Sequence, residues 1–225
     1  MIQSVLFTKK VDVIGISQQL GNVLSVESKP TLTIELNPVE DIQSNILSAC
    51  KHYIITSQNS VKAIQSLPLD GYFYVVGKKT ATQLQELGFQ VKVVVDYAKD
   101  LVPLLLQQQE TTCWNFFCGN TRRDHLVDEL KKNQHQVNEI ITYQSSPIEY
   151  QLNHSFDAYV FFSPLSFQTF VKNNIIPTNS TIFTIGKTTT TAVEKVYPNH
   201  TIITASTPLL EVVVNNIKDC INDKK

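Results

Sequence analysis

The feature that most constrains this chain is a strand and helix pattern that occurs twice with related residues. Tyr53–Ser57 reads Tyr-Ile-Ile-Thr-Ser, and Tyr159–Ser163 reads Tyr-Val-Phe-Phe-Ser. Val76–Thr82 reads Val-Gly-Lys-Lys-Thr-Ala-Thr, and Ile185–Thr191 reads Ile-Gly-Lys-Thr-Thr-Thr-Thr. Self-similarity over tens of residues predicts two copies of one open α/β lobe.

Short apolar runs alternate with segments of helical length along the chain. The expected strands are 5–7, 31–36, 53–55, 73–76, 91–95, 114–117 and the stretch that leads to Tyr143. The expected helices are 16–20, 39–50, one from residue 60, one between Gly77 and Gly88, 100–108 and 123–132. Strands that alternate with helices of this length predict parallel sheets with helices on both faces.

Two breaks divide this pattern into domains. Asn37-Pro38 ends one expected strand, and Pro147 ends the strand through Tyr143 because proline removes a backbone donor. Because the first strand and helix precede the first break, we expect the N-terminal segment to complete the lobe made by the C-terminal half. The expected lobes are residues 1–35 with 148–225, and residues 39–141, with linkers at 36–38 and 142–147.

Charge and composition exclude several classes of protein. Nineteen basic and twenty acidic residues give a formal charge of -1, unlike the basic surface of a nucleic-acid binder. No stretch approaches the roughly 18 apolar residues that span a bilayer. The four cysteines lack CxxC spacing and predict reduced thiols in a cytoplasmic protein. No large apolar stripe remains once the lobes are built, which favours a monomer.

Four loops follow expected strands at the place where open α/β sheets bind ligands, beyond the carboxyl ends. Their small residues let a ligand approach the backbone, and their hydroxyls add donors. The alternative is that these serines and threonines are ordinary helix N-caps, each worth about 1 kcal/mol. The loops are 56–59, 77–80, 163–166 and 186–189.

The segment Phe117–Asp124 is less usual, because a glycine turn is followed by Arg122 and Arg123 at the start of an expected helix. Arginine there opposes the helix dipole, whereas its planar donors suit a carboxylate or phosphate. A solvated face or pairing with Asp124 is the alternative. The histidines show no metal-ligand spacing, and the GxGxxG, P-loop and GxSxG motifs are missing from the sequence.

Together these residues resemble the uroporphyrinogen-III synthase family over nearly the whole chain. The more specific points are Cys118-Gly119-Asn120 with Arg123, Thr142-Tyr143-Gln144, Phe161-Phe162-Ser163-Pro164, and Ile185-Gly186 followed by Thr188-Thr189. Phe7-Thr8, Thr56-Ser57, and Val76-Gly77 with Thr80 fit less specifically.

The resemblance implies two flavodoxin-like lobes joined by two extended linker strands, and no cofactor. It implies a lyase that cyclises hydroxymethylbilane, a linear tetrapyrrole with eight carboxylates, to uroporphyrinogen III in heme biosynthesis. The last ring, ring D, would be inverted through a spirocyclic intermediate. Neither nucleic acid nor membrane is an expected partner.

The resemblance also implies roles for individual residues. Tyr143 would assist loss of the hydroxyl, although it could instead only pack at the crossing between lobes. Lys9 and Lys187 replace an arginine and a proline of many relatives, and both keep or add positive charge. The residues implied in substrate binding are Thr8, Lys9, Ser57, Gly77, Thr80, Asn120, Arg123, Ser163, Ser166, Gly186, Lys187, Thr188 and Thr189.

Two other functions fit the duplicated lobes. One is a two-lobed cytoplasmic binding or sensor protein for a small anionic metabolite, without catalysis. The other is a scaffold that has lost activity. Only the synthase is expected to produce uroporphyrinogen III.

Overall fold

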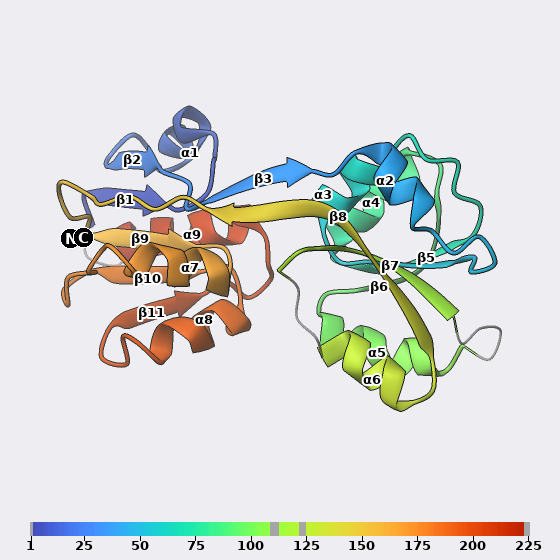
Figure 1. Ribbon diagram of the computed structural model, residues 1–225. Coiled ribbons are helices and arrows are strands. Elements are labelled where there is room, and N and C mark those ends of the chain that lie inside the picture. The colour runs from blue at the N-terminus through green and yellow to red at the C-terminus, as the bar shows by residue number, and fades with distance from the viewer. Residues whose placement is uncertain (1, 109–112, 122–124, 223–225) are drawn as a thin grey trace. The chain divides into compact units, whose positions relative to one another are not determined.

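The chain forms two compact units in the computed structural model, which describes residues 2–108, 113–121 and 125–222 (Figure 1). The first unit combines Met1–Thr33 with Ser146–Lys225, and the second is Ile34–Ser145. Both boundaries fall inside strands, one in β3 (Leu32–Leu36) and one in β8 (Gln136–Pro147).

The first unit contains one parallel sheet. Its strands are β1 (Ser4–Phe7), β2 (Ser25–Ser28), β9 (Ala158–Phe161), β10 (Thr181–Thr184) and β11 (Thr201–Thr204). Its helices are α1 (Val13–Gln19), α7 (Pro164–Val171), α8 (Lys187–Glu194) and α9 (Leu210–Asn222). The strand order is β11-β10-β9-β1-β2, and every pairing is parallel.

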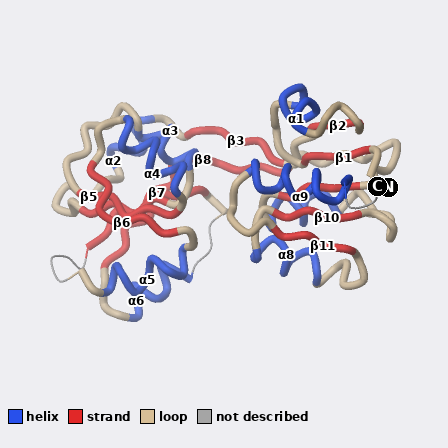
Figure 2. The backbone as a smooth tube through the Cα atoms, turned by 180° about the vertical axis from the view of Figure 1, so that it is seen from behind, coloured by secondary structure: helices blue, strands red, loops and turns tan. Residues whose placement is uncertain are grey.

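Side chains alternate between the two faces of this sheet, so a hydrophobic core forms on each face. Val5 and Phe7 pack with α1 and α9, whereas Leu6 points to the other face and packs with α7 and α8. Helices α7 and α8 lie in front of the sheet in Figure 1, and α9 lies in front of it in the reverse view of Figure 2. Both faces of the sheet are therefore covered.

The second unit repeats this architecture. Its further strands are β4 (His52–Ile55), β5 (Tyr72–Val76), β6 (Gln90–Val95) and β7 (Cys113–Gly119). Its helices are α2 (Val39–Ser44), α3 (Gln58–Ile64), α4 (Lys78–Glu86), α5 (Ala98–Leu106) and α6 (His125–Lys132). The strand order is β3-β8-β7-β4-β5-β6. Helices α2, α3 and α4 pack on one face, and α5 and α6 pack on the other.

The two sheets are wound in the same way. In the second unit β4, β5 and β6 extend the sheet in one direction, and β7 and β8 extend it in the other. In the first unit β9, β10 and β11 correspond to β4, β5 and β6, and β1 and β2 correspond to β7 and β8. Ligands of doubly wound sheets bind beyond the carboxyl ends where the direction reverses. Those points lie between β4 and β7, and between β9 and β1.

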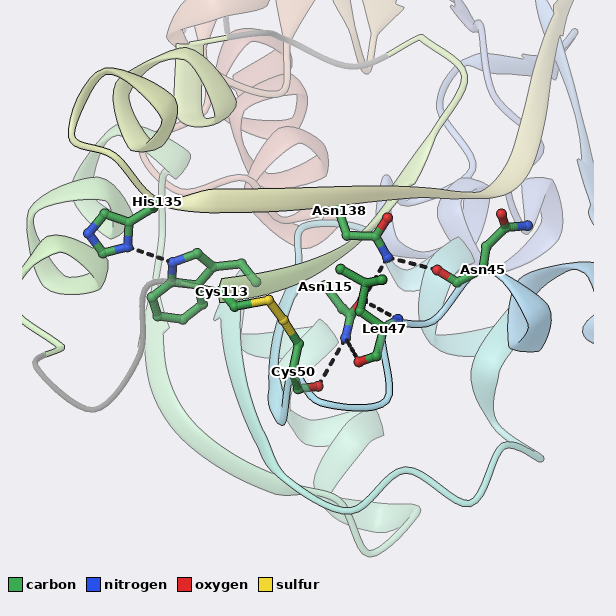
Figure 3. The surroundings of a disulfide bond; sticks show 8 residues. Asn45, Leu47, Cys50, Cys113, Asn115, His135 and Asn138 are labelled. Carbon is green, nitrogen blue, oxygen red and sulfur yellow. Dashed lines mark hydrogen bonds between the residues drawn. A yellow bond between two sulfur atoms is a disulfide. The ribbon is translucent and has the colours of Figure 1, made fainter.

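A disulfide joins Cys50 to Cys113 across 63 positions of sequence (Figure 3). Their Cα atoms are 5.7 Å apart, which is usual for this bond. The expectation of reduced thiols is therefore wrong for this pair. Cys50 precedes β4 and Cys113 begins β7, and the pairing of these two strands brings together cysteines whose spacing in sequence carries no such signal.

Buried Asn115 organises the backbone beside the disulfide (Figure 3). Its amide nitrogen donates to the carbonyls of Leu47 and Cys50, both at 3.0 Å. Its oxygen accepts from the Leu47 N-H at 3.1 Å and from the Asn138 amide at 2.8 Å. The chain from Leu47 to Cys50 is thus turned toward Asn115, so the helix expected over 39–50 ends at Ser44.

Other expected elements are present with shifted ends, and β2 is a strand that the sequence pattern did not predict. Of the helix expected over 123–132, residues 123 and 124 lie outside the described part of the chain. Within the described part, no helix combines the length and apolar character needed to cross a membrane.

Candidate active site

Tyr143 lies on β8 beside the carboxyl end of β7, where the pairing register changes. Cys118 is paired with Ile141, but the next residue, Gly119, is paired with Tyr143. Thr142 is therefore an extra residue on β8, which makes this a β-bulge. Bulges alter the direction of the side chains that follow them, so this one affects where Tyr143 points.

The Tyr143 ring lies directly against Gly119. A Cβ atom added to Gly119 would meet Cζ of Tyr143 at 2.5 Å and its hydroxyl oxygen at 2.8 Å. Real Cβ contacts are not that short, so any side chain larger than glycine would displace the ring. The half-buried phenol thus occupies space that exists only because residue 119 is glycine.

Hydrogen bonds fix the backbone around Tyr143. The Thr142 hydroxyl is buried, donates to the Cys118 carbonyl at 3.0 Å and lies 2.9 Å from the Ser60 Oγ. On the other edge of β8, the Asn37 N-H donates to the Thr142 carbonyl at 3.0 Å. Neighbours on both sides therefore hold this part of the strand.

Asn120, predicted to bind substrate, is placed next to the same segment. Its Oδ1 accepts from the Ser145 N-H at 2.8 Å, and its Nδ2 is 3.4 Å from the Ser145 carbonyl. Its own N-H donates to the Tyr143 carbonyl at 3.2 Å. The geometry gives Asn120 a structural contact with β8 on each side of Gln144.

Three further predicted residues of this unit lie at the same edge of the sheet. Ser57 caps α3 and accepts from the Asn59 N-H at 3.2 Å, as the N-cap alternative expected. Gly77 is the N-cap of α4 and has φ +93°, a backbone conformation that favours glycine. Thr80 is buried in the first turn of α4. Arg123, predicted to bind substrate, lies outside the described residues.

Hydroxyl groups also meet at the carboxyl end of β1 in the first unit. The Thr8 hydroxyl donates to the Val160 carbonyl at 2.7 Å and lies 3.0 Å from the Ser166 Oγ. The Thr31 hydroxyl lies 2.7 Å from the same Ser166 oxygen. Thr8 and Ser166 are only 2% and 3% exposed, so both predicted binding residues are engaged inside the protein.

Lys9 extends from the same edge into solvent. Its Nζ lies over the Phe162 ring, 5.6 Å from the centroid, in cation–π geometry. Ser163 follows and caps α7, accepting from the Ser166 N-H at 3.0 Å. An ammonium group and a helix N-terminus thus border the point where the sheet of this unit reverses direction, and both favour an anion.

The loop after β10 has two exposed residues among the predicted donors. Gly186 is the N-cap of α8, and Lys187 and Thr188 are exposed in its first turn. Thr189 is buried, and its N-H donates to the Gly186 carbonyl at 3.0 Å. Lys187 and Thr188 are therefore the residues of this loop that a ligand can reach without rearrangement.

Sequence reasoning did not single out several residues that shape these edges. The Thr190 hydroxyl lies 2.6 Å from the hydroxyls of Thr184 and Thr204, and it joins β10, α8 and β11. The contacts of Gly119 and Thr142 with the strand that carries Tyr143 were also not foreseen. A glycine at the end of a strand is a known signal of close approach, but it does not say which group approaches.

The arrangement suits an organic polyanion. Each unit presents helix N-termini, hydroxyls and backbone N-H groups at the carboxyl edge of its sheet, and Lys9 and Lys187 add positive charge to the first unit. Tyr143 adds a phenol, which can donate a hydrogen bond. The family model described as uroporphyrinogen-III synthase HemD matches residues 23–212.

The chain belongs to the uroporphyrinogen-III synthase family.

Solved structures of this family share the fold. One is uroporphyrinogen-III synthetase from Helicobacter pylori 26695, with a TM-score of 0.68 and 13% identity, covering 97% of this chain and 100% of that chain. Another is a mutant uroporphyrinogen III synthase from the extremely thermophilic bacterium Thermus thermophilus, with a TM-score of 0.71 and 16% identity, covering 98% and 99%. No curated protein matches the chain. Uroporphyrinogen-III synthases are cofactor-independent lyases of heme biosynthesis.

Proposed function

We propose that this protein cyclises hydroxymethylbilane to uroporphyrinogen III and inverts ring D. The match of the family model over residues 23–212 carries the proposal, because it covers most of both units. The position of Tyr143 supports it, because its phenol lies beside the end of β7, at the carboxyl edge on which doubly wound sheets bind ligands.

The reaction needs one proton at its start. A proton supplied to the hydroxymethyl oxygen lets the C–O bond break, and water leaves with the bonding electrons while the ring nitrogen stabilises the resulting azafulvene. We assign the delivery of this proton, or a hydrogen bond that assists the departure, to the Tyr143 phenol. General acid assistance of this kind is typically worth about a hundredfold or more in rate.

The remaining steps depend on position. The substituted carbon of ring D forms a bond to the azafulvene methylene and gives the spirocyclic intermediate. That intermediate then opens at the other methylene bond and closes again with ring D inverted, and a proton is lost. Holding one carbon of ring D nearest the electrophile is a positioning effect, which can be worth several kcal/mol.

The donors at the carboxyl edges supply the positioning. In this proposal they bind the acetate and propionate groups of the bilane through backbone N-H groups, hydroxyls and ammonium groups. Ser57, Gly77 and Thr80 act in the second unit together with Arg123. In the first unit the binding residues are Ser163, Gly186 and the exposed Lys9, Lys187 and Thr188.

We also propose that the protein is a monomer that works in the cytoplasm without nucleic acid or a membrane partner. The near-neutral charge favours neither of these polyanionic surfaces. The disulfide is unusual for that compartment, where such bonds are rare.

Separation of the isomers formed from hydroxymethylbilane tests the proposal. Purified protein is incubated with the bilane, and the products are oxidised and resolved into isomers I and III. We expect isomer III in proportion to enzyme, against isomer I in the blank from spontaneous closure. Isomer I alone, together with stabilisation by an unrelated anion, would instead identify a binding protein.

A further inference from the structure

We propose that Gly119 and Thr142 are positioning residues that hold the Tyr143 phenol at the carboxyl edge of the second unit. The role of these residues in the reaction rests on the proposed function, whereas their contacts with Tyr143 do not depend on it. Neither residue needs to touch the substrate in this role.

Gly119 provides the space in which the ring lies. The ring atoms Cζ and Cε2 of Tyr143 lie 2.5 and 2.6 Å from the position of a Cβ on Gly119, and the hydroxyl lies at 2.8 Å. Even a methyl group at residue 119 would therefore occupy the volume of the phenol. The ring could then keep neither its position nor its direction.

Thr142 sets the direction in which the Tyr143 side chain points. It is the extra residue of the bulge, since Cys118 pairs with Ile141 and Gly119 pairs with Tyr143. Its hydroxyl anchors the bulge to the Cys118 carbonyl and to Ser60 on α3, at 3.0 and 2.9 Å. Because side chains alternate along a strand, removing the extra residue would turn Tyr143 away from Gly119.

The backbone carrying the ring is fixed from both edges, which makes these two residues decisive. The Asn37 N-H holds the Thr142 carbonyl, and the Asn120 N-H holds the Tyr143 carbonyl. With the main chain held, the ring can respond to a change at residue 119 only by moving itself. A displaced phenol would lie away from the hydroxyl that it must assist.

A spectroscopic experiment tests the geometry without any substrate. The chain has eight tyrosines, so protein labelled with 13C at tyrosine Cζ gives eight resonances, and Tyr143→Phe identifies one of them. We expect Gly119→Ala to shift or broaden that resonance. Gly88→Ala is the matched control, because residue 88 has φ +84° and a Cβ there meets no atom within 4 Å. It introduces backbone strain in the same unit without touching Tyr143.

Steady-state kinetics test the role in the reaction. We expect Gly119→Ala to lower kcat for isomer III by roughly tenfold to a hundredfold, as small misplacements of catalytic groups do, with little change in KM. The double variant Gly119→Ala/Tyr143→Phe should be no slower than Tyr143→Phe alone. Gly88→Ala should keep the wild-type kcat.

Thr142 keeps the test decisive if Gly119→Ala does not fold. Thr142→Val removes the hydroxyl at nearly constant shape, and Thr142→Ser keeps it. We expect the valine variant to move the Tyr143 resonance and lower kcat, and the serine variant to restore both.

Three results would overturn the proposal. The first is a Tyr143 resonance unmoved in both Gly119→Ala and Thr142→Val. The second is a moved resonance with wild-type kcat, and the third is a further loss of activity in the double variant. Failure of the proposed function is distinguishable, because the unmodified protein would then form no isomer III whatever its spectrum.

Discussion

At the scale of the residue, Tyr143 is defined by its two neighbours on β7 and β8. Gly119 leaves room for its ring, and the bulge at Thr142 sets its direction. A tyrosine that only packed at this strand would need a hydrophobic side chain as its partner, and Gly119 offers none. Tyr143 instead contacts a bare backbone and stays partly exposed at the edge of the sheet.

The Tyr143 hydroxyl is expected to matter for rate and little for stability. Tyr143→Phe keeps the ring on Gly119 and removes the proton donor, so kcat should fall by roughly a hundredfold. Measured initial rates of isomer III formation and a thermal melt on the same sample check this. Tyr72→Phe is the control, because Tyr72 is 42% exposed and begins β5 at the opposite end of the sheet. Wild-type rates in Tyr143→Phe would remove the phenol from the mechanism.

At the scale of the element, the disulfide ties the loop before β4 to the beginning of β7. A crosslink over 63 positions restricts the unfolded chain and is worth about 4 kcal/mol by loop entropy. We expect dithiothreitol to lower the urea midpoint of the wild type and to leave that of Cys50→Ala/Cys113→Ala unchanged. Thiol titration of the denatured oxidised chain should find two thiols, rising to four on reduction. Four thiols before reduction would contradict the disulfide.

Asp157 connects β9 to β1 through its carboxylate. Its Oδ2 accepts from the Gln3 N-H at 2.9 Å and from the Ser4 N-H and hydroxyl at 3.0 Å. Burial raises the pKa of this carboxyl, but the hydrogen bonds from Gln3 and Ser4 together outweigh it, and the pKa lies below its usual value. The stabilisation is therefore complete above the unfolded pKa, about 3.9, and is lost as pH falls through the folded pKa.

Acid unfolding tests this connection. Asp157→Asn should lower the free energy of unfolding at pH 7 by about 1 to 2 kcal/mol, because the charged hydrogen bonds are lost. Below about pH 4 the difference from wild type should shrink, since the carboxyl of the unfolded chain then binds a proton while the folded carboxyl stays charged down to its lower pKa. Urea titrations from pH 7 to pH 3 measure both. A difference that stays constant with pH would show that the charge of Asp157 is not involved.

Expected and observed elements agree where local sequence determines them. Buried apolar runs such as Tyr53-Ile54-Ile55 predicted their strands, because a strand covered on both faces is apolar throughout. β2 was missed because only Val26 in Ser25–Ser28 is apolar, as suits an edge strand. The end of α2 depends on Asn115, which lies far away in sequence, and helical periodicity cannot report such a contact.

The sequence predicted which residues and loops form the candidate site, but not the contacts that those residues make. The Thr142-Tyr143-Gln144 resemblance selected Tyr143 as a candidate, and the rule for open α/β sheets predicted which loops lie at the carboxyl edge. Sequence could not show that Thr8 and Ser166 bond to each other inside the protein. A hydroxyl on a small side chain has the same appearance in sequence whether it faces solvent or a buried partner. The bulge depends on the register between β7 and β8, and the sequence of either strand alone does not determine that register.

At the scale of the whole molecule, each unit has its own two core clusters. Trp114 is the single tryptophan of the chain and lies buried in the second unit, so its fluorescence reports that unit alone. Far-ultraviolet circular dichroism reports both. The two signals therefore separate the stabilities of the units.

Core variants in one unit should leave the other unit's transition in place. Phe183→Ala removes a buried ring from the first unit at a cost of about 3 to 5 kcal/mol. We expect an earlier urea transition by circular dichroism, with the tryptophan midpoint unchanged. Leu84→Ala, in the second unit, should shift the tryptophan midpoint instead. Equal shifts of both signals in both variants would show that the units unfold as one.

The strand order of the first unit also dictates an order of events during translation. β1 and β2 leave the ribosome before the second unit, but β9, the other partner of β1, is encoded after the whole of that unit. Residues 34–145 can close their sheet as soon as they emerge, while the earliest strands of the chain still have an unpaired edge. The free edge of β1 is thus exposed to chaperones and to aggregation until β9 has been synthesised.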